Sequence, residues 1–361
     1  MRTTDSVADD IGSLVRPVGR SPVIVTDSVL LAACTAIVHE ALGCDVIIVP
    51  GGEPVVETVG ALARDIAGRD SDVVVAVGGG SVLDTAKLAA RLITDPDGLV
   101  ARLRAAEPFA PGAAVVALPT TAGSGAEVTR TAIVSHLGHK TWAWDERLRP
   151  DVAILAPELT ATTPRPVALA AGLDAFCHSV EAATGQRATT EMRALGFEAA
   201  ASIHLQLAAS LDTPRNVAAR TEMMRAACAA GVAIDHCGTG IGHAVGHALA
   251  SIVTIPHGLA VMLGLRAGLE WTLDASDTYE GLDASLGTSG GVAGLADAFD
   301  EFLAAVGFRD ELARWSRPTA EALAEEMRAE DHQPMCRNNA RPIGPGDIET
   351  VAMSVVEAWM P

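Results

Sequence analysis

Hydrophobic positions in the first 160 residues form short continuous runs that alternate with stretches of helical periodicity. The runs, rich in Val, Ile, Leu and Ala, are 22–27, 45–50, 72–80, 113–121 and 151–157. Between them, 28–43, 53–68 and 81–93 carry apolar residues three and four positions apart, the spacing of one helix face. Almost wholly apolar strands separated by helices are typical of a parallel sheet covered on both faces. The pattern therefore predicts an α/β domain.

The pattern changes near residue 160. Just before this point, residues 131–144 predict an inserted hairpin whose turn lies near Leu137 and Gly138. From TTPRP at 162–166 to the end, alanine-rich helical periods are broken at Gly, Pro and Asp, and no run predicts a strand. We therefore expect two domains, an α/β domain over 1–160 and an all-helical domain over 161–361.

Composition and charge narrow the class of protein. With 49% hydrophobic and 20% charged residues the chain is globular rather than disordered. Its net charge of −19 disfavours nucleic acid and anionic membranes as partners. Uncharged stretches near 108–126 and 248–265 are interrupted by Pro and Gly, and the acidic N-terminus lacks the apolar run of a signal peptide, so we expect a cytoplasmic protein without a membrane span. The 6 cysteines form no CxxC pair, which favours reduced thiols over disulfides or a zinc cluster.

A triple glycine in VVVAVGGGSVLDTAK separates a predicted strand from a helix that begins near Ser81. Glycine lets the backbone approach a ligand closely, and a helix N-terminus offers free N–H groups, so Gly79, Gly80 and Ser81 are candidates for binding a pyrophosphate. The stretch is neither a Walker loop nor the common dinucleotide fingerprint, because Leu83 stands where the third glycine belongs. The alternative is a purely structural turn; the place at the carboxyl end of a parallel strand favours a ligand.

Polar side chains end two further predicted strands at the same edge of the sheet. The loop in PTTAGSGAEVT supplies Thr120, Thr121 and Ser124 together with two glycines. Asp27 ends the first strand, where a carboxylate can accept hydrogen bonds from both ribose hydroxyls and would repel a 2′-phosphate. Asp27 could instead cap the helix predicted after it, or serve in both ways.

Three of the 10 histidines lie in GHAVGHALASIVTIPHG, at positions 243, 247 and 257. A second stretch, AAGLDAFCHSVEAATG, places Asp174 and His178 four residues apart, on one face of a helix that Glu181 continues. Together, one carboxylate and imidazoles from both stretches would complete a four-ligand site of the kind that suits Fe²⁺ or Zn²⁺ and fits Ca²⁺ poorly. The spacing leaves open which of the three histidines are ligands, and packing in the core is the alternative.

These motifs, in this order, resemble those of the iron-containing (group III) alcohol dehydrogenases, close to the lactaldehyde:propanediol oxidoreductase branch. The matching stretches are GGGSVLDTAK, PTTAGSGAEVT, GLDAFCHSVEA, GHAVGHALA and PHG, and the likeness runs from 23–27 to 336–343. It implies a dehydroquinate synthase-like architecture, with a Rossmann-like N-terminal domain, a helical C-terminal domain and an active site in the cleft between them. It also implies NAD(H), a small alcohol or aldehyde substrate and a homodimer or larger homo-oligomer.

The resemblance assigns roles residue by residue. The implied metal ligands are Asp174, His178, His243 and His257, for Fe²⁺ with Zn²⁺ as the alternative. His247 is then no ligand but lies near the nicotinamide and substrate, where it takes part in moving the proton. The implied cofactor contacts are Asp27 at the adenosine ribose, Gly79, Gly80 and Ser81 at the pyrophosphate, Thr120, Thr121 and Ser124 toward the nicotinamide, and Lys140 and Leu159 along the nucleotide.

Three departures from the family pattern bear on specificity. Glu53 replaces the Asn of an Asn-Pro pair, Ala156 replaces the Asp of an Asp-Pro pair, and Asn339-Ala340-Arg341 stands for Asn-Pro-Arg in a segment that borders the substrate in relatives. Because of the last change, the substrate can differ from that of the propanediol-type relatives.

The function expected from these parts is hydride transfer between NAD(H) and a small alcohol or carbonyl compound, with the metal polarising the substrate oxygen. One alternative on the same scaffold is a reductase of maleylacetate or of a phosphonate- or sulfonate-bearing aldehyde. A lyase related to dehydroquinate synthase is disfavoured because 240–260 contains no Lys or Arg for a phosphate. The remaining alternative is a non-catalytic nucleotide-binding protein.

Overall fold

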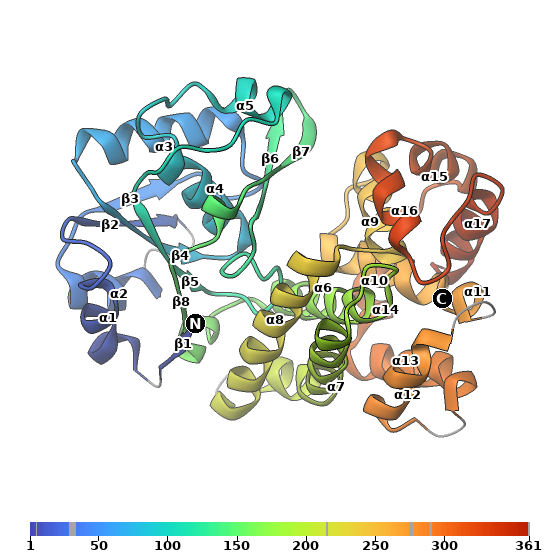
Figure 1. Ribbon diagram of the computed structural model, residues 1–361. Helices are drawn as coiled ribbons and strands as arrows, with labels where there is room; N and C mark the ends of the chain where they lie inside the picture. The colour runs from blue at the N-terminus through green and yellow to red at the C-terminus, as the bar shows by residue number, and fades with distance from the viewer. Residues whose placement is uncertain (5, 29–33, 214–215, 274–276, 289–290, 360–361) are drawn as a thin grey trace. The chain divides into compact units, whose positions relative to one another are not determined.

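The computed structural model describes residues 1–361 except 5, 29–33, 214–215, 274–276, 289–290 and 360–361. Contacts within the chain divide it into two units, Met1–Thr163 and Pro164–Pro361 (Figure 1). The boundary predicted at 160/161 falls at the end of the short helix η3 (Pro157–Thr160), just before this division. Within the described ranges, no helix combines the length and the apolar character needed to cross a bilayer.

A parallel sheet forms the centre of the N-terminal unit, as the hydrophobic runs predict. Its spatial order is β1 (Arg2–Thr3), β8 (Val152–Leu155), β5 (Ala114–Pro119), β4 (Val73–Gly78), β2 (Pro22–Asp27) and β3 (Val46–Val49). Each neighbouring pair is parallel. Gly78 lies opposite Pro119 and Asp27 opposite Val49, so the polar residues after these strands meet at one edge.

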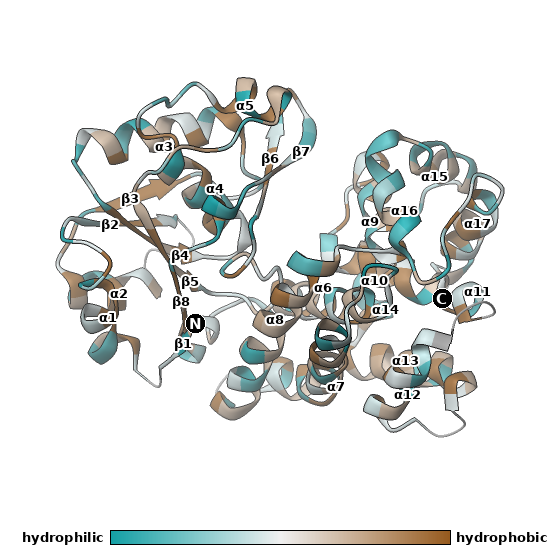
Figure 2. Cartoon of the chain, viewed as in Figure 1, coloured by the Kyte–Doolittle hydropathy of each residue, from teal (hydrophilic) through white to brown (hydrophobic). Residues whose placement is uncertain are grey.

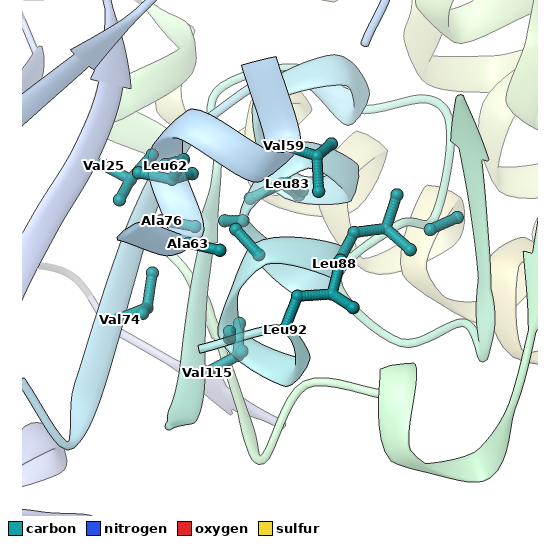
Figure 3. Close-up of a cluster of buried hydrophobic side chains, with 14 of the residues drawn as sticks. Val25, Val59, Leu62, Ala63, Val74, Ala76, Leu83, Leu88, Leu92 and Val115 are labelled. Carbon is teal, nitrogen blue, oxygen red and sulfur yellow. The ribbon is translucent and has the colours of Figure 1, made fainter. Parts of the chain in front are cut away.

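Helices cover both faces of this sheet because its strands are apolar on both sides. Along β4, Val73, Val75 and Val77 pack with α1 (Val7–Val15) and α2 (Ala36–Leu42). Val74 and Ala76 face the opposite way and pack with α3 (Val56–Gly68), α4 (Gly80–Arg91) and α5 (Leu99–Ala105), as Figure 3 shows for α3 and α4. The hydropathy colouring of Figure 2 is accordingly brown along the central strands.

Two N-terminal elements escaped the sequence analysis. Helix α1 places Val7, Ile11 and Val15 on its buried face, a four-residue spacing that would have revealed it. Strand β1 has only 2 residues and is defined by its pairing with β8, which no local pattern could show. Of the helix predicted over 28–43, the structure has α2, and 29–33 lie outside the described residues.

The predicted hairpin is present as β6 (Thr131–His136) and β7 (His139–Trp144). Leu137 and Gly138 both have positive φ, as a two-residue hairpin turn of type I′ requires. The fully buried Lys87 of α4 ties the hairpin to the sheet domain, because its Nζ donates to the carbonyl oxygens of Thr131 and Ala126 and lies 3.1 Å from Asp84 Oδ1.

The C-terminal unit is helical and contains no strand in the part that the structure describes. Its helices are α6 (Arg165–Thr184), α7 (Thr190–Asp212), α8 (Val217–Cys237), α9 (Ile241–Ile252), α10 (His257–Ala267), α11 (Leu269–Leu273), α12 (Glu280–Leu286), α13 (Leu295–Val306), α14 (Phe308–Leu312), α15 (Ala320–Met327), α16 (Gln333–Asn338) and α17 (Ile348–Ala358). Every residue of α6 from Gly172 to Thr184 is buried, and α7, α8 and α10 pack against this helix (Figure 1).

Candidate metal centre and nucleotide-binding edge

Close packing of three helices builds the candidate metal centre in the C-terminal unit. α10 packs against both α6 and α9 (Figure 1). At Gly258 a Cβ would lie 1.7 Å from the carbonyl oxygen of Ala170, so only glycine lets the first turn of α10 approach α6 this closely. His257, the first residue of α10, is thereby brought beside α6. A Cβ at Gly242 would lie 2.8 Å from Val261 O, so α9 and α10 also approach each other closely.

One carboxylate oxygen is the meeting point of three imidazoles. Asp174 Oδ1 lies 3.6 Å from His178 Nε2, 3.5 Å from His243 Nε2 and 3.6 Å from His257 Nε2. Ligand atoms at about 2.1 Å from a tetrahedral metal are separated by about 3.4 Å, close to these distances. Ligand atoms of Asp174, His178 and His243 all lie within 4.8 Å of one another, and the Asp174–His257 distance adds a fourth donor.

Two of the donor atoms also fit a metal because they lack a hydrogen-bond partner in the described part of the chain. Among the described residues, the buried Asp174 Oδ1 and His243 Nε2 have no hydrogen-bond partner. Buried polar atoms are nearly always satisfied, so two unsatisfied atoms that face each other fit the donor set of a metal ion. Nitrogen and carboxylate donors are those that Fe²⁺ and Zn²⁺ take.

The electrostatics of the cluster balance buried negative and positive charge. Burial opposes ionisation of Asp174, but the charges of His178 and His257 outweigh it and hold the pKa of this carboxyl below its usual range. Burial likewise disfavours charge on His243, yet Glu181 and Asp174 raise its pKa to about 10. Glu181 has a lowered pKa because His243 outweighs its burial.

His247 lies in the same cluster of histidine rings. Its ring centroid is 5.9 Å from that of His243 and 5.4 Å from that of His257. The buried His332, which sequence analysis did not single out, lies next to it at 6.4 Å. His332 belongs to the 3-10 helix η6 (Glu330–His332). Because it lies far from the other histidines along the chain, no local sequence pattern indicated that it would lie beside them.

The second residue that sequence reasoning left without a role is Glu181. It is fully buried on α6, and its Oε2 accepts a 2.5 Å hydrogen bond from His243 Nδ1. The helical face shared by Asp174, His178 and Glu181 was visible in the sequence, but the partner of Glu181 was not.

In the N-terminal unit, the loops after β4 and β5 come together as expected. Gly79 is the N-cap of α4, and a Cβ there would lie 3.5 Å from Thr121 Oγ1. A Cβ at Gly80 would lie 2.7 Å from Ser124 Oγ, so this glycine is needed for the close approach. Ser81 is exposed in the first turn of α4, where backbone N–H groups have no intrahelical partner. The edge therefore has the features of an anion site.

The remaining predicted cofactor residues lie on several elements of the same unit. Asp27 ends β2, which neighbours β4, and Lys140 of β7 lies 3.7 Å from Glu53 Oε2. Thr120 and Leu159 are each only 1% exposed. Leu159 packs in a hydrophobic core of the sheet domain, and its backbone carbonyl accepts a hydrogen bond from the Cys34 thiol.

Family models match most of the chain. The model described as iron-containing alcohol dehydrogenase matches 2–157. The model for the C-terminal part of the Fe-containing alcohol dehydrogenase family matches 168–350.

Two curated relatives illustrate the range of activities among similar proteins. A probable alcohol dehydrogenase of Escherichia coli, EutG, is 33% identical over 62% of this chain and 57% of its own length. A phosphonoacetaldehyde reductase of Streptomyces viridochromogenes is 36% identical over 64% of this chain and 61% of its own length. The matched part thus spans a little over half the length of these relatives.

Solved structures match over nearly their whole length. A sulfoacetaldehyde reductase from Bifidobacterium kashiwanohense in complex with NAD⁺ is 26% identical, covers 98% of this chain and 96% of its own, and superposes with a TM-score of 0.89. An iron-containing alcohol dehydrogenase from Thermococcus thioreducens, at 24% identity, shares the fold with a TM-score of 0.86 over 99% and 97% of the two chains. From the family models over both units, the chain belongs to the iron-containing alcohol dehydrogenase family.

Proposed function

We propose that the protein is a metal-containing, NAD(H)-dependent oxidoreductase that interconverts a small alcohol and its aldehyde or ketone. The observation that carries this proposal is the convergence of three imidazole nitrogens on one buried oxygen of Asp174, at 3.5 to 3.6 Å. Such a cluster is costly to bury without an ion between its members, so a role in packing alone does not account for it. Membership of the family agrees with the donor set.

In this proposal Asp174, His178, His243 and His257 hold Fe²⁺, with Zn²⁺ as the alternative. When bound, the ion supplies Lewis acidity that polarises a carbonyl oxygen or lowers the pKa of an alcohol. The protein supplies the arrangement: α6 contributes two ligands one helical turn apart, and the first turns of α9 and α10 each contribute one.

We further propose that NAD(H), which carries the hydride, binds at the carboxyl edge of the sheet. The N-terminus of α4, with Gly79, Gly80 and Ser81, would hold the pyrophosphate through backbone N–H groups. Asp27 would accept hydrogen bonds from the adenosine ribose. The other contacts in this proposal are Thr120, Thr121, Ser124, Lys140 and Leu159.

His247 is proposed as the residue that handles the proton released from the alcohol. Its ring is close to those of His243 and His257 and is half-buried, so an imidazole nitrogen can hold a proton near the substrate. It is not proposed as a ligand, because Asp174 and the three imidazoles around it complete a four-donor site without it.

The names of two relatives favour a second candidate for the substrate. One similar chain is a phosphonoacetaldehyde reductase and another is a sulfoacetaldehyde reductase. A short aldehyde with an anionic group is therefore the alternative to a neutral alcohol or aldehyde.

The decisive experiment is a substrate panel on metal-free protein reconstituted separately with Fe²⁺ and Zn²⁺. NADH oxidation would be followed with neutral short aldehydes and ketones and with sulfonate- and phosphonate-bearing aldehydes. We expect turnover that requires added metal and favours NADH over NADPH. Metal and NADH binding without turnover of any carbonyl compound would support the non-catalytic alternative instead.

A further inference from the structure

Glu181 connects the helix that carries two proposed ligands with the helix that carries a third. It lies on α6, and its side chain is 1% exposed. Its Oε2 accepts a hydrogen bond of 2.5 Å from His243 Nδ1, and its Oε1 accepts one of 3.2 Å from the backbone N–H of His243. Both oxygens of one carboxylate are therefore directed at a single residue.

One of these two hydrogen bonds stabilises the N-terminus of helix α9. The N–H groups in the first turn of a helix have no intrahelical partners, and buried ones must find acceptors elsewhere. Glu181 Oε1 accepts from His243 N, and Asn339 Oδ1 accepts from Ile241 N at 3.2 Å. Asn339 is 2% exposed and also donates to Arg341 O at 2.8 Å, so it caps α9 from a distant segment.

The contact with the imidazole has a separate consequence. An ionised carboxylate only accepts hydrogen bonds, so Nδ1 of His243 must carry the hydrogen, and Nε2 is left to bind an ion. Nε2 is the atom that lies 3.5 Å from Asp174 Oδ1 and has no hydrogen-bond partner among the described residues. A carboxylate on one nitrogen of a ligating histidine fixes the orientation of the ring and its tautomer.

We propose that Glu181 is a positioning residue for the metal site, which holds the His243 ring so that Nε2 faces Asp174. The inference rests on the proposed metal site. Asn339 supplies a matched comparison, because it caps the same helix without touching an imidazole. A comparison of variants at the two residues therefore separates the stabilisation of α9 from the orientation of the His243 ring.

The test compares Glu181→Gln, Glu181→Asp and Asn339→Ala with the unmodified chain, using Co²⁺ as the probe. Affinity is measured by chelator competition, ligand geometry by the visible absorption of bound Co²⁺, and stability by thermal unfolding of the metal-free proteins. We expect Glu181→Gln to lose roughly 10–100-fold in Co²⁺ affinity and to change the Co²⁺ spectrum. Asn339→Ala should lower Tm by roughly 2–4 °C and leave affinity and spectrum unchanged.

Glu181→Asp keeps the negative charge, but its side chain is shorter by one methylene, so the carboxylate oxygens lie farther from His243. This variant provides the test if Glu181→Gln does not fold. If Glu181 orients the His243 ring, the Asp variant should also show a reduced Co²⁺ affinity and an altered Co²⁺ spectrum. The inference is overturned if the Glu181 variants lose stability as Asn339→Ala does while they bind Co²⁺ with the affinity and spectrum of the unmodified chain. If the unmodified chain itself binds no Co²⁺, the proposed metal site fails, and the inference fails with it.

Discussion

Asp174 and Glu181 place two carboxylates in the interior of the helical unit, on one face of α6. Carboxylates of this kind are stable only when positive charge lies beside them. In the metal-free protein that charge is a proton on an imidazole, which is why the pKa of His243 is raised to about 10 by Glu181 and Asp174 in spite of burial. A divalent ion would supply the charge in place of the proton.

The different positions of two neighbouring histidines lead to the first prediction. His243→Ala removes a donor 3.5 Å from Asp174, so metal content and activity should fall together. His247→Ala leaves all four proposed donors in place, so the metal should stay bound while turnover drops roughly 10–1000-fold, the range for a group that transfers a proton. Metal analysis and steady-state kinetics on the two purified variants provide the measurement.

If both residues only pack in the core, the two variants should lose similar thermal stability and keep full metal content. Loss of metal from His247→Ala with retention in His243→Ala would reverse the assignment of ligand and proton-handling residue.

Asp27 is predicted to set the preference for NAD(H) over NADP(H). Asp27→Ser removes the negative charge that would repel a 2′-phosphate, so the ratio of kcat/KM for NADPH to that for NADH should rise at least about tenfold. Metal content is the control and should not change. An unchanged ratio would place the adenosine ribose away from Asp27.

At the scale of elements, the spacing between α9 and α10 depends on glycine. At Gly246 a Cβ would lie 2.5 Å from Val261 Cγ1 and 3.0 Å from Val261 N. Gly246→Ala should therefore push the helices apart, lower the free energy of unfolding by roughly 1–3 kcal/mol and weaken metal binding. Gly12→Ala in α1 is the matched control, because its Cβ would meet nothing within 4 Å, and it should gain roughly 0.5–1 kcal/mol. Denaturant unfolding and chelator competition measure both effects, and equal behaviour of the two variants would show that the interhelical distance does not matter.

The starts of β2 and β4 are joined by Asp72, whose carboxylate accepts hydrogen bonds from Arg20 N at 3.0 Å and Ser21 N at 2.7 Å. These bonds lower the pKa of Asp72 below its ordinary value of 3.8. Because the folded-state pKa is depressed, the stabilisation is present above about pH 4 and is lost as the pH falls through the folded-state pKa.

Asp72→Asn should therefore destabilise the protein near neutral pH. The loss should be only roughly 1 kcal/mol, since water screens the charge of this exposed carboxylate. The difference from the unmodified chain should shrink below about pH 4. Urea unfolding between pH 3 and 7 measures it, and a difference that is independent of pH would show that the charge of Asp72 does not contribute.

For the whole molecule, the proposed metal ligands all lie in one of the two units. Added metal should therefore protect amide hydrogens of α6, α9 and α10 from exchange, and it should leave the strands of the N-terminal sheet unchanged. Metal at about 100 times its Kd would stabilise the unit by about 2.7 kcal/mol. Hydrogen exchange with and without Zn²⁺ measures the effect, with NAD⁺ expected to protect the sheet edge instead. Protection by metal that is confined to the N-terminal unit would contradict the proposed site.

Periodicity predicted the elements that carry the function because each rests on local chemistry. The valine-rich part of the run at 72–80 predicted a strand buried on both faces, and the glycines that end this run predicted the turn into the next helix. Asp174 and His178, four residues apart on a helix, had to share a face whatever surrounded them. Likewise, the hairpin turn at Leu137 and Gly138 followed from the residue types that flank it.

The amino-acid sequence by itself thus determined the fold class, the family and the residues that offer donor atoms. Only the tertiary structure decided which donors meet. His257 comes to Asp174 because Gly258 allows α10 to touch α6, and Glu181 finds His243, 62 positions away, through the same packing. It also decided that Leu159 lies inside the core. The physical reason is that helical and strand periodicities are set within a few residues, whereas a contact between helices depends on side-chain volumes contributed by distant parts of the chain.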